Sequence, residues 1–193
     1  MFMSDSTTIT HKNIQGWCDF EDLYGHIVKD KLKDGDVAVE VGTWLGRSAA
    51  FFISEMVKNN KQLKFYCVDL WGGPQDDDFM NRFVSQNNGS IFNIFENNMK
   101  NCGFANKYSP IVGDSRKSAE KFENASVDFC FIDGNHNYDC VKGDIQAWIP
   151  KVKKGAIMAG HDIDRESVVK AVRECFGNKW KKTSERCWTV VIN

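Results

Sequence analysis

An acidic residue and two glycines stand together in the stretch Asp36-Val-Ala-Val-Glu40-Val-Gly42-Thr-Trp-Leu-Gly46-Arg-Ser48. A carboxylate at Glu40 would repel phosphates, and the third glycine of the dinucleotide fingerprint is missing, so a pyrophosphate ligand is disfavoured. The same carboxylate suits a ligand with hydroxyls, an ammonium or a sulfonium. The helix expected after Gly46 would offer free N–H groups to an anionic group such as a carboxylate. A lone glycine pair also fits a structural tight turn, and the strand ends farther along the chain decide between the two interpretations.

The elements that must position these residues follow from the hydrophobic periodicity. Residues 37–41 form a short, mostly β-branched run, which is typical of a central parallel strand, and helical spacing of apolar residues begins after Gly46. Further strands are expected at residues 64–69, 108–112, 127–132, 155–160 and 187–192, with helices over 14–32, 49–57, 92–102, 141–149 and 168–176. Residues 71–82 contain glycines and lack periodicity, so a flap is expected there.

Strands that alternate with helical patterns predict an α/β fold. We expect a Rossmann-like, doubly wound and mostly parallel sheet with helices on both faces. The last strand is expected to pair with residues 179–183 in a C-terminal antiparallel hairpin. The 193 residues fit one domain over 1–193, on which residues 1–35 form a helical N-terminal extension.

Charge and composition favour a small-molecule partner. The net charge of −1, without a basic block, disfavours nucleic acid and anionic membranes. The chain has no apolar run of membrane-spanning length, and its polar start, residues 4–8, lacks the apolar core of a signal peptide, so a cytoplasmic location is expected. Seven cysteines without a Cys-x-x-Cys pair indicate reduced thiols rather than disulfides or a zinc site. The oligomeric state stays open, a homo-oligomer included.

Polar residues follow every predicted parallel strand. The five strand ends carry Glu40 and Gly42, Asp69-Leu70-Trp71, Gly113-Asp114-Ser115, Asp133-Gly134-Asn135-His136, and Gly160-His161-Asp162. Each end has its own structural explanation, such as helix capping for Asp114, but ligands of these sheets bind at this edge, and five polar ends together predict a binding site. Asp69 closes the second strand, where a carboxylate can accept both ribose hydroxyls of an adenosine-containing ligand.

The pattern Glu40-x-Gly42-x-x-x-Gly46 followed by Val68-Asp69 resembles the cofactor site of class I S-adenosylmethionine-dependent methyltransferases. The second half, Phe131-Ile-Asp-Gly-Asn-His-Asn-Tyr138 with Asp144-Ile-x-x-Trp148 and Gly160-His-Asp162, is similar to the small-molecule subgroup that includes macrolide-sugar O-methyltransferases. The resemblance covers about residues 36–165. It implies S-adenosylmethionine as cofactor, contacted by Glu40, Gly42, Thr43, Gly46, Ser48, Asp69, Leu70, Asp114, Ser115 and Asp133. By this resemblance the turn at 42–48 lies against the methionine moiety, and Asp114 accepts from the adenine amine.

Related members of this family bind a divalent metal through an acid after the fourth strand and two acidic or amide residues after the fifth. The resemblance places that set on Asp133, His161 and Asp162. Histidine in place of an oxygen ligand suits Mg²⁺ less well, so another divalent ion, or none, stays open. O-Methylation needs the acceptor hydroxyl deprotonated, and a metal would lower its pKa directly. Otherwise His136 or His161 is the candidate general base, with Asp133 placed to orient either.

The sequence thus predicts an S-adenosylmethionine-dependent methyltransferase that O-methylates a small hydroxylated metabolite or a sugar. Two other classes stay open: a catalytically silent nucleotide-binding or scaffold domain, and a metal-dependent hydroxylase or hydrolase on the same fold. The acids and histidines after the fourth and fifth strands favour catalysis, because a silent scaffold would not need such a polar edge.

Overall fold

The computed structural model describes residues 9–72 and 77–193, which are built on a seven-stranded sheet. Its strands are β1 (Val37–Val41), β2 (Lys64–Asp69), β3 (Ser109–Val112), β4 (Val127–Ile132), β5 (Val152–Gly160), β6 (Lys181–Lys182) and β7 (Trp188–Val191). They lie in the order β3-β2-β1-β4-β5-β7-β6. The first five pair in parallel, whereas β7 runs antiparallel to both β5 and β6. The predicted mostly parallel sheet with a C-terminal antiparallel hairpin is therefore confirmed.

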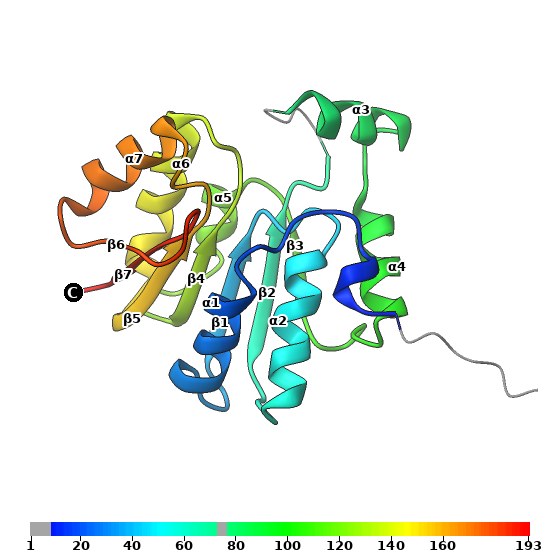
Figure 1. Cartoon of the computed structure of the whole chain (residues 1–193), viewed down its shortest axis with the longest axis horizontal. Coiled ribbons are helices and arrows are strands. Elements are labelled where there is room, and N and C mark those ends of the chain that lie inside the picture. Colours follow the sequence, from blue (N-terminus) through cyan, green and yellow to red (C-terminus); the bar gives the residue numbers. More distant parts are fainter. Residues whose placement is uncertain (1–8, 73–76) are drawn as a thin grey trace, which may run out of the picture.

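Helices cover both faces of this sheet (Figure 1). The α-helices are α1 (Glu21–His26), α2 (Arg47–Lys58), α3 (Asp78–Gln86), α4 (Phe92–Asn101), α5 (Ser115–Ala119), α6 (Tyr138–Trp148) and α7 (Glu166–Phe176). Short 3₁₀ turns are η1 (His11–Asn13) and η3 (Ile149–Lys151), and η2 (Ile27–Lys31) is π-helical. Helices α1, α2 and α4 pack on one face and α5, α6 and α7 on the other, so each face has its own apolar core.

Strand β1 alternates between these two cores. Ala38 belongs to the core under α2, whereas Val39 and Val41 belong to the core under α6 and α7. Because side chains in a strand alternate between faces, Glu40 points to the α2 side, where Ser48 of that helix donates a hydrogen bond to it. The strand therefore aims its one acid at the start of the helix that follows.

The N-terminal segment differs from the prediction. The helix expected over residues 14–32 begins only at Glu21, and residues 14–20 have no regular structure. Gly16 has φ +133°, which no helix allows, so the apolar residues around it act as separate anchors rather than as one helical face. Ile14 and Phe20 are buried, whereas Trp17 between them is 58% exposed. We call residues 14–20 the N-terminal strap.

The segment after β2 also departs from expectation. Helix α3 occupies 78–86, of which 78–82 fall in the predicted flap, and Asp77 caps it by accepting a hydrogen bond from the backbone N–H of Met80 at 3.0 Å. Residues 73–76 of that flap, like the polar start at 4–8, lie outside the described residues. Helix α5 starts after Asp114, the residue for which helix capping was predicted, and Val57 near the end of α2 is exposed. No disulfide and no helix long and apolar enough to cross a membrane occurs within 9–72 and 77–193.

The ends of β1 and β4 meet at Gly42. Its φ is +88°, and a Cβ there would lie 1.9 Å from the carbonyl oxygen of Asp133. The backbone N–H of Asp133 donates to the carbonyl of Val41 at 2.8 Å, and that of Gly42 donates to Val68 at 2.8 Å. Glycine is required here because the backbone of the next strand occupies the space of a side chain.

We expect Gly42→Ala to destabilise the fold by about 3 kcal/mol or more, because it adds a backbone clash to the strain of a positive φ. Gly35→Ala is the matched control, since Gly35 has φ +87° and a methyl group added there would meet nothing within 4 Å. That variant should lose only about 1 kcal/mol. Urea unfolding followed by circular dichroism measures both, and equal losses would show that the Asp133 contact adds nothing.

Candidate functional site

A cavity of about 520 Å³ lies beyond the carboxyl ends of the parallel strands. The predicted site residues that line it are Gly42, Thr43, Ser48, Asp69, Leu70, Asp114, Ser115, Asp133, His136, His161 and Asp162. Glu40 and Gly46 do not line it, and Gly46 packs instead beside Phe95 of α4. The wall also includes residues to which no site role was assigned, among them Gly16 and Trp17 of the strap, Trp44, Arg47, Asp77, Met80, Arg116, Cys140, Asp144, Arg165 and Arg186.

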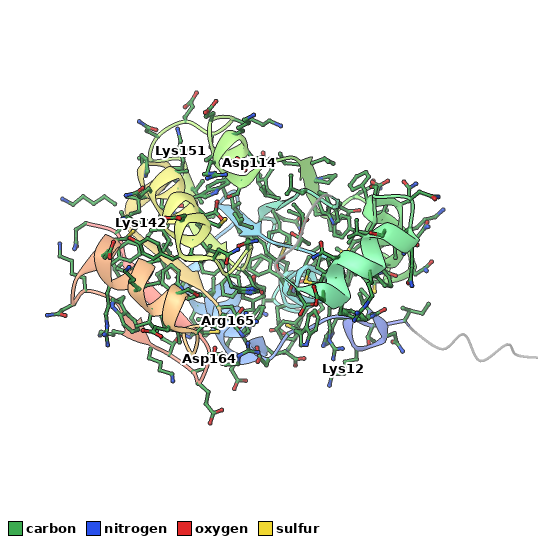
Figure 2. All side chains as sticks on the ribbon, turned by 90° about the horizontal axis from the view of Figure 1, so that it is seen from above. Lys12, Asp114, Lys142, Lys151, Asp164 and Arg165 are labelled. Atoms are coloured by element: carbon green, nitrogen blue, oxygen red, sulfur yellow. The ribbon has the colours of Figure 1, made fainter. Side chains whose placement is uncertain are left out.

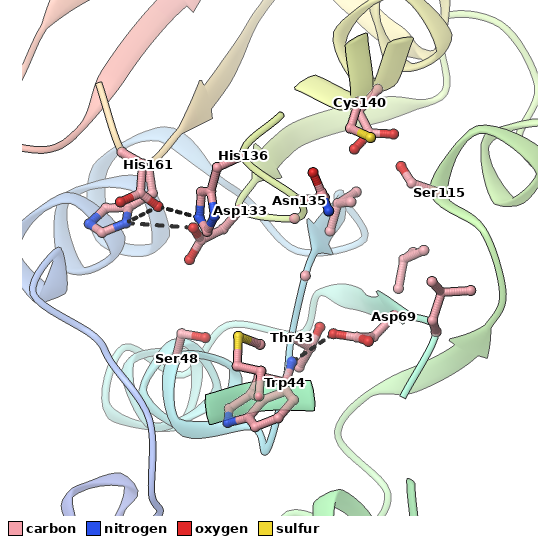
Figure 3. A pocket seen from close by; sticks show the side chains of 18 of the residues that line it. Thr43, Trp44, Ser48, Asp69, Ser115, Asp133, Asn135, His136, Cys140 and His161 are labelled. Atoms are coloured by element: carbon pink, nitrogen blue, oxygen red, sulfur yellow. Dashed lines mark hydrogen bonds and ion pairs between the residues drawn. The ribbon is translucent and has the colours of Figure 1, made fainter. Parts of the chain in front are cut away.

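Three side chains that follow β4 and β5 converge at one end of this cavity. Figure 3 labels two of them, Asp133 and His136. Asp133, His136 and Asp162 each offer a ligand atom, and these atoms lie within 4.8 Å of one another. Nε2 of His136 lies 2.7 Å from Oδ2 of Asp162. We call these residues the acid–histidine cluster. Two carboxylates and an imidazole are a donor set that divalent ions such as Mn²⁺ accept.

His161 lies between the acids of this cluster and Asp19 of the strap. Its Nε2 lies 2.6 Å from Oδ1 of Asp19 in the strap, and its Nδ1 lies 3.2 Å from Oδ2 of Asp162 and 3.5 Å from Oδ1 of Asp133. Burial lowers the pKa of His161, but the neighbouring carboxylates of Asp133 and Asp162 outweigh it and raise that pKa to about 10. Both ring nitrogens thus face carboxylates, an arrangement that favours the imidazolium over the neutral form that a metal ligand or a base needs.

The converging donors favour a ligand set that differs from the predicted one. The sequence pattern suggested Asp133, His161 and Asp162 as metal ligands, whereas the three donors that converge include His136. His161 instead bridges acids from the strap and from the end of β5. Its role as general base is disfavoured for the same reason, since an imidazolium has no free lone pair.

Asp162 is held by cations on its other side. Arg186, in the loop before β7, donates to its Oδ1, and Nε of Arg165 lies 3.3 Å from the same oxygen. Burial raises the pKa of Asp162, but its bonds to the two histidines, His136 and His161, outweigh this and hold that pKa well below its usual range. Its φ of +56° is unusual for a residue with a side chain, so the surrounding contacts must hold it there.

The opposite end of the cavity contains Asp69 and the turn after β1. Oδ2 of Asp69 accepts from the backbone N–H of Trp44 at 2.8 Å, and Oδ1 accepts from that of Trp71 at 2.7 Å. Burial raises the pKa of Asp69, although these backbone N–H groups counter it. Trp71 itself is buried against Phe92 and Phe95, so its side chain packs in the core.

Helix α5 and its cap form a further wall. Oδ1 of Asp114 accepts from the backbone N–H groups of Arg116 and Lys117, both at 3.1 Å, which confirms the predicted helix cap. Oγ of Ser115 accepts from Nε1 of Trp148 at 2.9 Å. Asp144 is buried beside them, and burial raises its pKa to about 6. Figure 2 shows Asp114 beside α5 and Arg165 near the start of α7, so the polar wall comes from separated parts of the edge.

Polar atoms along the turn after β1 are buried without a hydrogen-bond partner. They are Oγ1 of Thr43, Nε1 of Trp44 and Nε of Arg47, as judged over the described residues. Buried polar groups are normally satisfied, so orphans that line a cavity point to a polar ligand. A cavity of this size and lining is typical of sites for small organic molecules and cofactors.

Comparison with known proteins shows the family to which this chain belongs. A profile described as methyltransferase domain matches residues 39–163, more than half of the chain. The chain belongs to the methyltransferase domain family. The predicted membership of the S-adenosylmethionine-dependent methyltransferases is thereby confirmed.

Relatives of this methyltransferase-domain protein are distant. The uncharacterized protein y4gI of Sinorhizobium fredii is 25% identical over 126 residues, which make up 65% of this chain and 13% of that protein. The chain thus spans a small part of that curated relative.

Solved structures share the fold at low identity. The O-methyltransferase NovP superposes with a TM-score of 0.68 at 14% identity, over 89% of this chain and 78% of that chain. The calicheamicin methyltransferase CalS11 gives a TM-score of 0.59 at 14% identity, over 89% of this chain and 76% of that chain. These structures therefore share with this chain the Rossmann-like fold that the sequence predicted.

The buried acid of β1 should make the stability of this domain depend on pH. Glu40 is fully buried, its Oε1 accepts from Ser48, and its Oε2 has no hydrogen-bond partner in the described chain. Burial raises its pKa from 4.5 to about 8. Folding therefore takes up a proton between those values. The contribution of Glu40 to stability is complete below about pH 4.5 and is lost as pH rises through about 8.

We expect Glu40→Gln, which mimics the protonated acid, to remove this dependence. In EDTA, wild type should lose up to about 1.4 kcal/mol of unfolding free energy per pH unit relative to the variant across that window. Urea unfolding of both proteins at several pH values gives the difference. Parallel curves for wild type and variant would mean that Glu40 is ionised in the folded state.

Proposed function

We propose that this protein is an S-adenosylmethionine-dependent O-methyltransferase that acts on a small hydroxylated molecule, such as a sugar. The observation that carries the proposal is the acid–histidine cluster, whose donor atoms lie within 4.8 Å of one another in the same cavity as Asp69 and the turn after β1. One end of the cavity has groups that can activate a hydroxyl, and the other has groups that suit an adenosine. CalS11 is described in a second structure as a TDP-rhamnose 3′-O-methyltransferase, which supports a sugar as acceptor here.

The cofactor supplies a methyl group bound to a positively charged sulfur. Asp69 lines the cavity with a carboxylate that can accept from ribose hydroxyls in addition to two backbone N–H groups, because it has about four acceptor sites. Asp114 and Ser115 line the part that suits the adenine ring. Glu40 supports the site from beneath by holding Ser48, which does line the cavity.

Hydroxyl activation falls to the acid–histidine cluster. Asp133, His136 and Asp162 fit a divalent ion, which would lower the pKa of an acceptor hydroxyl. Arg186, Arg165 and His161 offset part of the charge of these carboxylates, which lowers the need for a metal ion. His136 then has an alternative role as general base, and Asp162 at 2.7 Å would stabilise its protonated form. The metal route and the histidine route both deprotonate the acceptor hydroxyl at this cluster. Removal of the metal ion distinguishes them, because only the metal route needs it.

The other function classes are less well supported. A silent scaffold would not need Asp162 buried with a positive φ among its cationic neighbours. A hydroxylase or hydrolase could use the same cluster. That function would not explain Asp69, the acid that suits a ribose, or the buried polar atoms of the turn after β1 that have no hydrogen-bond partner in the described chain. Cofactor binding is therefore the observation that tests the proposal.

We expect the purified protein to bind S-adenosylhomocysteine in calorimetry, and Asp69→Asn to weaken that binding at least tenfold, since charge-assisted hydrogen bonds contribute about 1.5 to 3 kcal/mol each. Asp34→Asn is the control, because that aspartate lies outside the cavity and bonds the backbone of Gln62. Absence of binding by wild type would refute the cofactor, and unchanged affinity of the Asp69 variant would remove this acid from the ribose site.

We expect Mn²⁺ to bind to the acid–histidine cluster and to show nitrogen coupling from one histidine in pulsed electron paramagnetic resonance. His136→Gln should abolish that coupling, whereas His161→Gln should keep it, because the structure turns His161 towards Asp19. Asp162→Asn should weaken Mn²⁺ binding at least tenfold. Coupling that disappears with His161 rather than His136 would restore the original ligand set, and no Mn²⁺ binding at all would favour His136 as base.

A further inference from the structure

Four arginines line the cavity, and they differ in their partners. Arg116 pairs with Asp114 at 3.1 Å, Arg165 lies 3.3 Å from Asp162, and Arg186 contacts Asp162, Asp164 and Asp19. Arg47 forms no ion pair with any acid in the described part of the chain. It is thus the cavity arginine whose charge the folded protein leaves uncompensated.

Arg47 is nevertheless held in place. It is the first residue of α2, and its Nη1 donates to the carbonyl of Ile14 in the N-terminal strap at 3.3 Å. Its Nε is buried and has no hydrogen-bond partner among residues 9–72 and 77–193. Leaving a buried donor of a charged group unpaired is costly, so the geometry suits a guanidinium that waits for an anion.

Two neighbours reinforce this preference. Oγ1 of Thr43, a residue only 2% exposed, lines the same wall and also has no hydrogen-bond partner in the described chain. The first turn of α2 adds backbone N–H groups and the positive end of a helix dipole. A cation, a hydroxyl and a helix start therefore surround one corner of the cavity.

The same cavity is also lined by acids. The carboxylates of Asp69 and Asp133 both line it. A ligand that carries a carboxylate and an amine a few bonds apart would match this division of charge. An amino acid end has that pattern.

We propose that Arg47 binds the carboxylate of the cofactor's methionine end. The amine of that end is then left to the carboxylates that line the same cavity. This inference rests on the proposed function, because it names a contact of the same cofactor. It also gives the N-terminal strap a role, since the carbonyl of Ile14 accepts from the guanidinium and so helps to orient it at the cavity wall. A point charge on lysine would not reproduce such a fork.

Calorimetry with two probes tests the contact. One is S-adenosylhomocysteine, and the other is its decarboxylated analogue, which keeps the adenosine, the thioether and the amine. Wild type should bind S-adenosylhomocysteine at least tenfold more tightly, as expected of a charge-assisted contact. Arg47→Met should erase this ratio by weakening S-adenosylhomocysteine alone, and Arg47→Lys should restore only part of it. Arg116→Met removes a cavity arginine that is already paired and should keep the wild-type ratio.

The outcomes separate this proposal from its foundation. If wild type binds neither probe, the proposed function fails. If wild type binds both equally, the cofactor stands, but its carboxylate has no receptor and Arg47 must serve an anionic group of the acceptor instead, which overturns the inference. A parallel loss of both probes in Arg47→Met, with the ratio intact, would assign Arg47 to holding the strap through Ile14 and would also overturn it.

Discussion

The close contact between Gly42 and the backbone of Asp133 is the constraint on which the site depends. The carbonyl oxygen of Asp133 stands where a side chain at Gly42 would be, so the ends of β1 and β4 cannot separate or tolerate a larger residue between them. Asp69, at the end of β2, connects that strand to the same edge because its carboxylate accepts a hydrogen bond from the backbone N–H of Trp44. The turn after β1, Asp69 and Asp133 are therefore parts of one edge that is set by backbone contacts rather than by flexible side chains.

Charge compensation is the second organising principle of this edge. Several acids lie around the end of β5. Their charge is compensated by Arg186 from the hairpin loop, by Arg165 at the N-cap of α7, and by His161, whose pKa is raised. These contacts keep Asp162 ionised although it is buried. Around α2 the balance is reversed, because Arg47 has no paired acid in the described chain. The cavity thus has an acidic end that is internally compensated and a basic corner that is not.

Much of this arrangement could be predicted from the sequence because strand periodicity is a strong signal. The runs at 64–69 and 127–132 match β2 and β4 residue for residue, and the polar residues after them do meet at one edge. Side-chain direction could not be predicted. His136 and His161 both follow parallel strands and both contact Asp162. The sequence could not show that His161 also contacts Asp19, which lies 142 residues away along the chain. The helix prediction for the N-terminal strap was wrong for a related reason. The spacing of its apolar residues is helical, but Gly16 adopts a φ that helices exclude.

The boundaries of the family match divide the cavity wall into two parts. Trp17, Arg165 and Arg186 all lie outside residues 39–163, whereas the turn after β1, Asp69 and Asp133 lie inside. Chain segments beyond the shared region therefore close the cavity over a shared fold. Evolution can rebuild that closing wall by changing the two flanking segments alone, so proteins that share this domain need not share an acceptor.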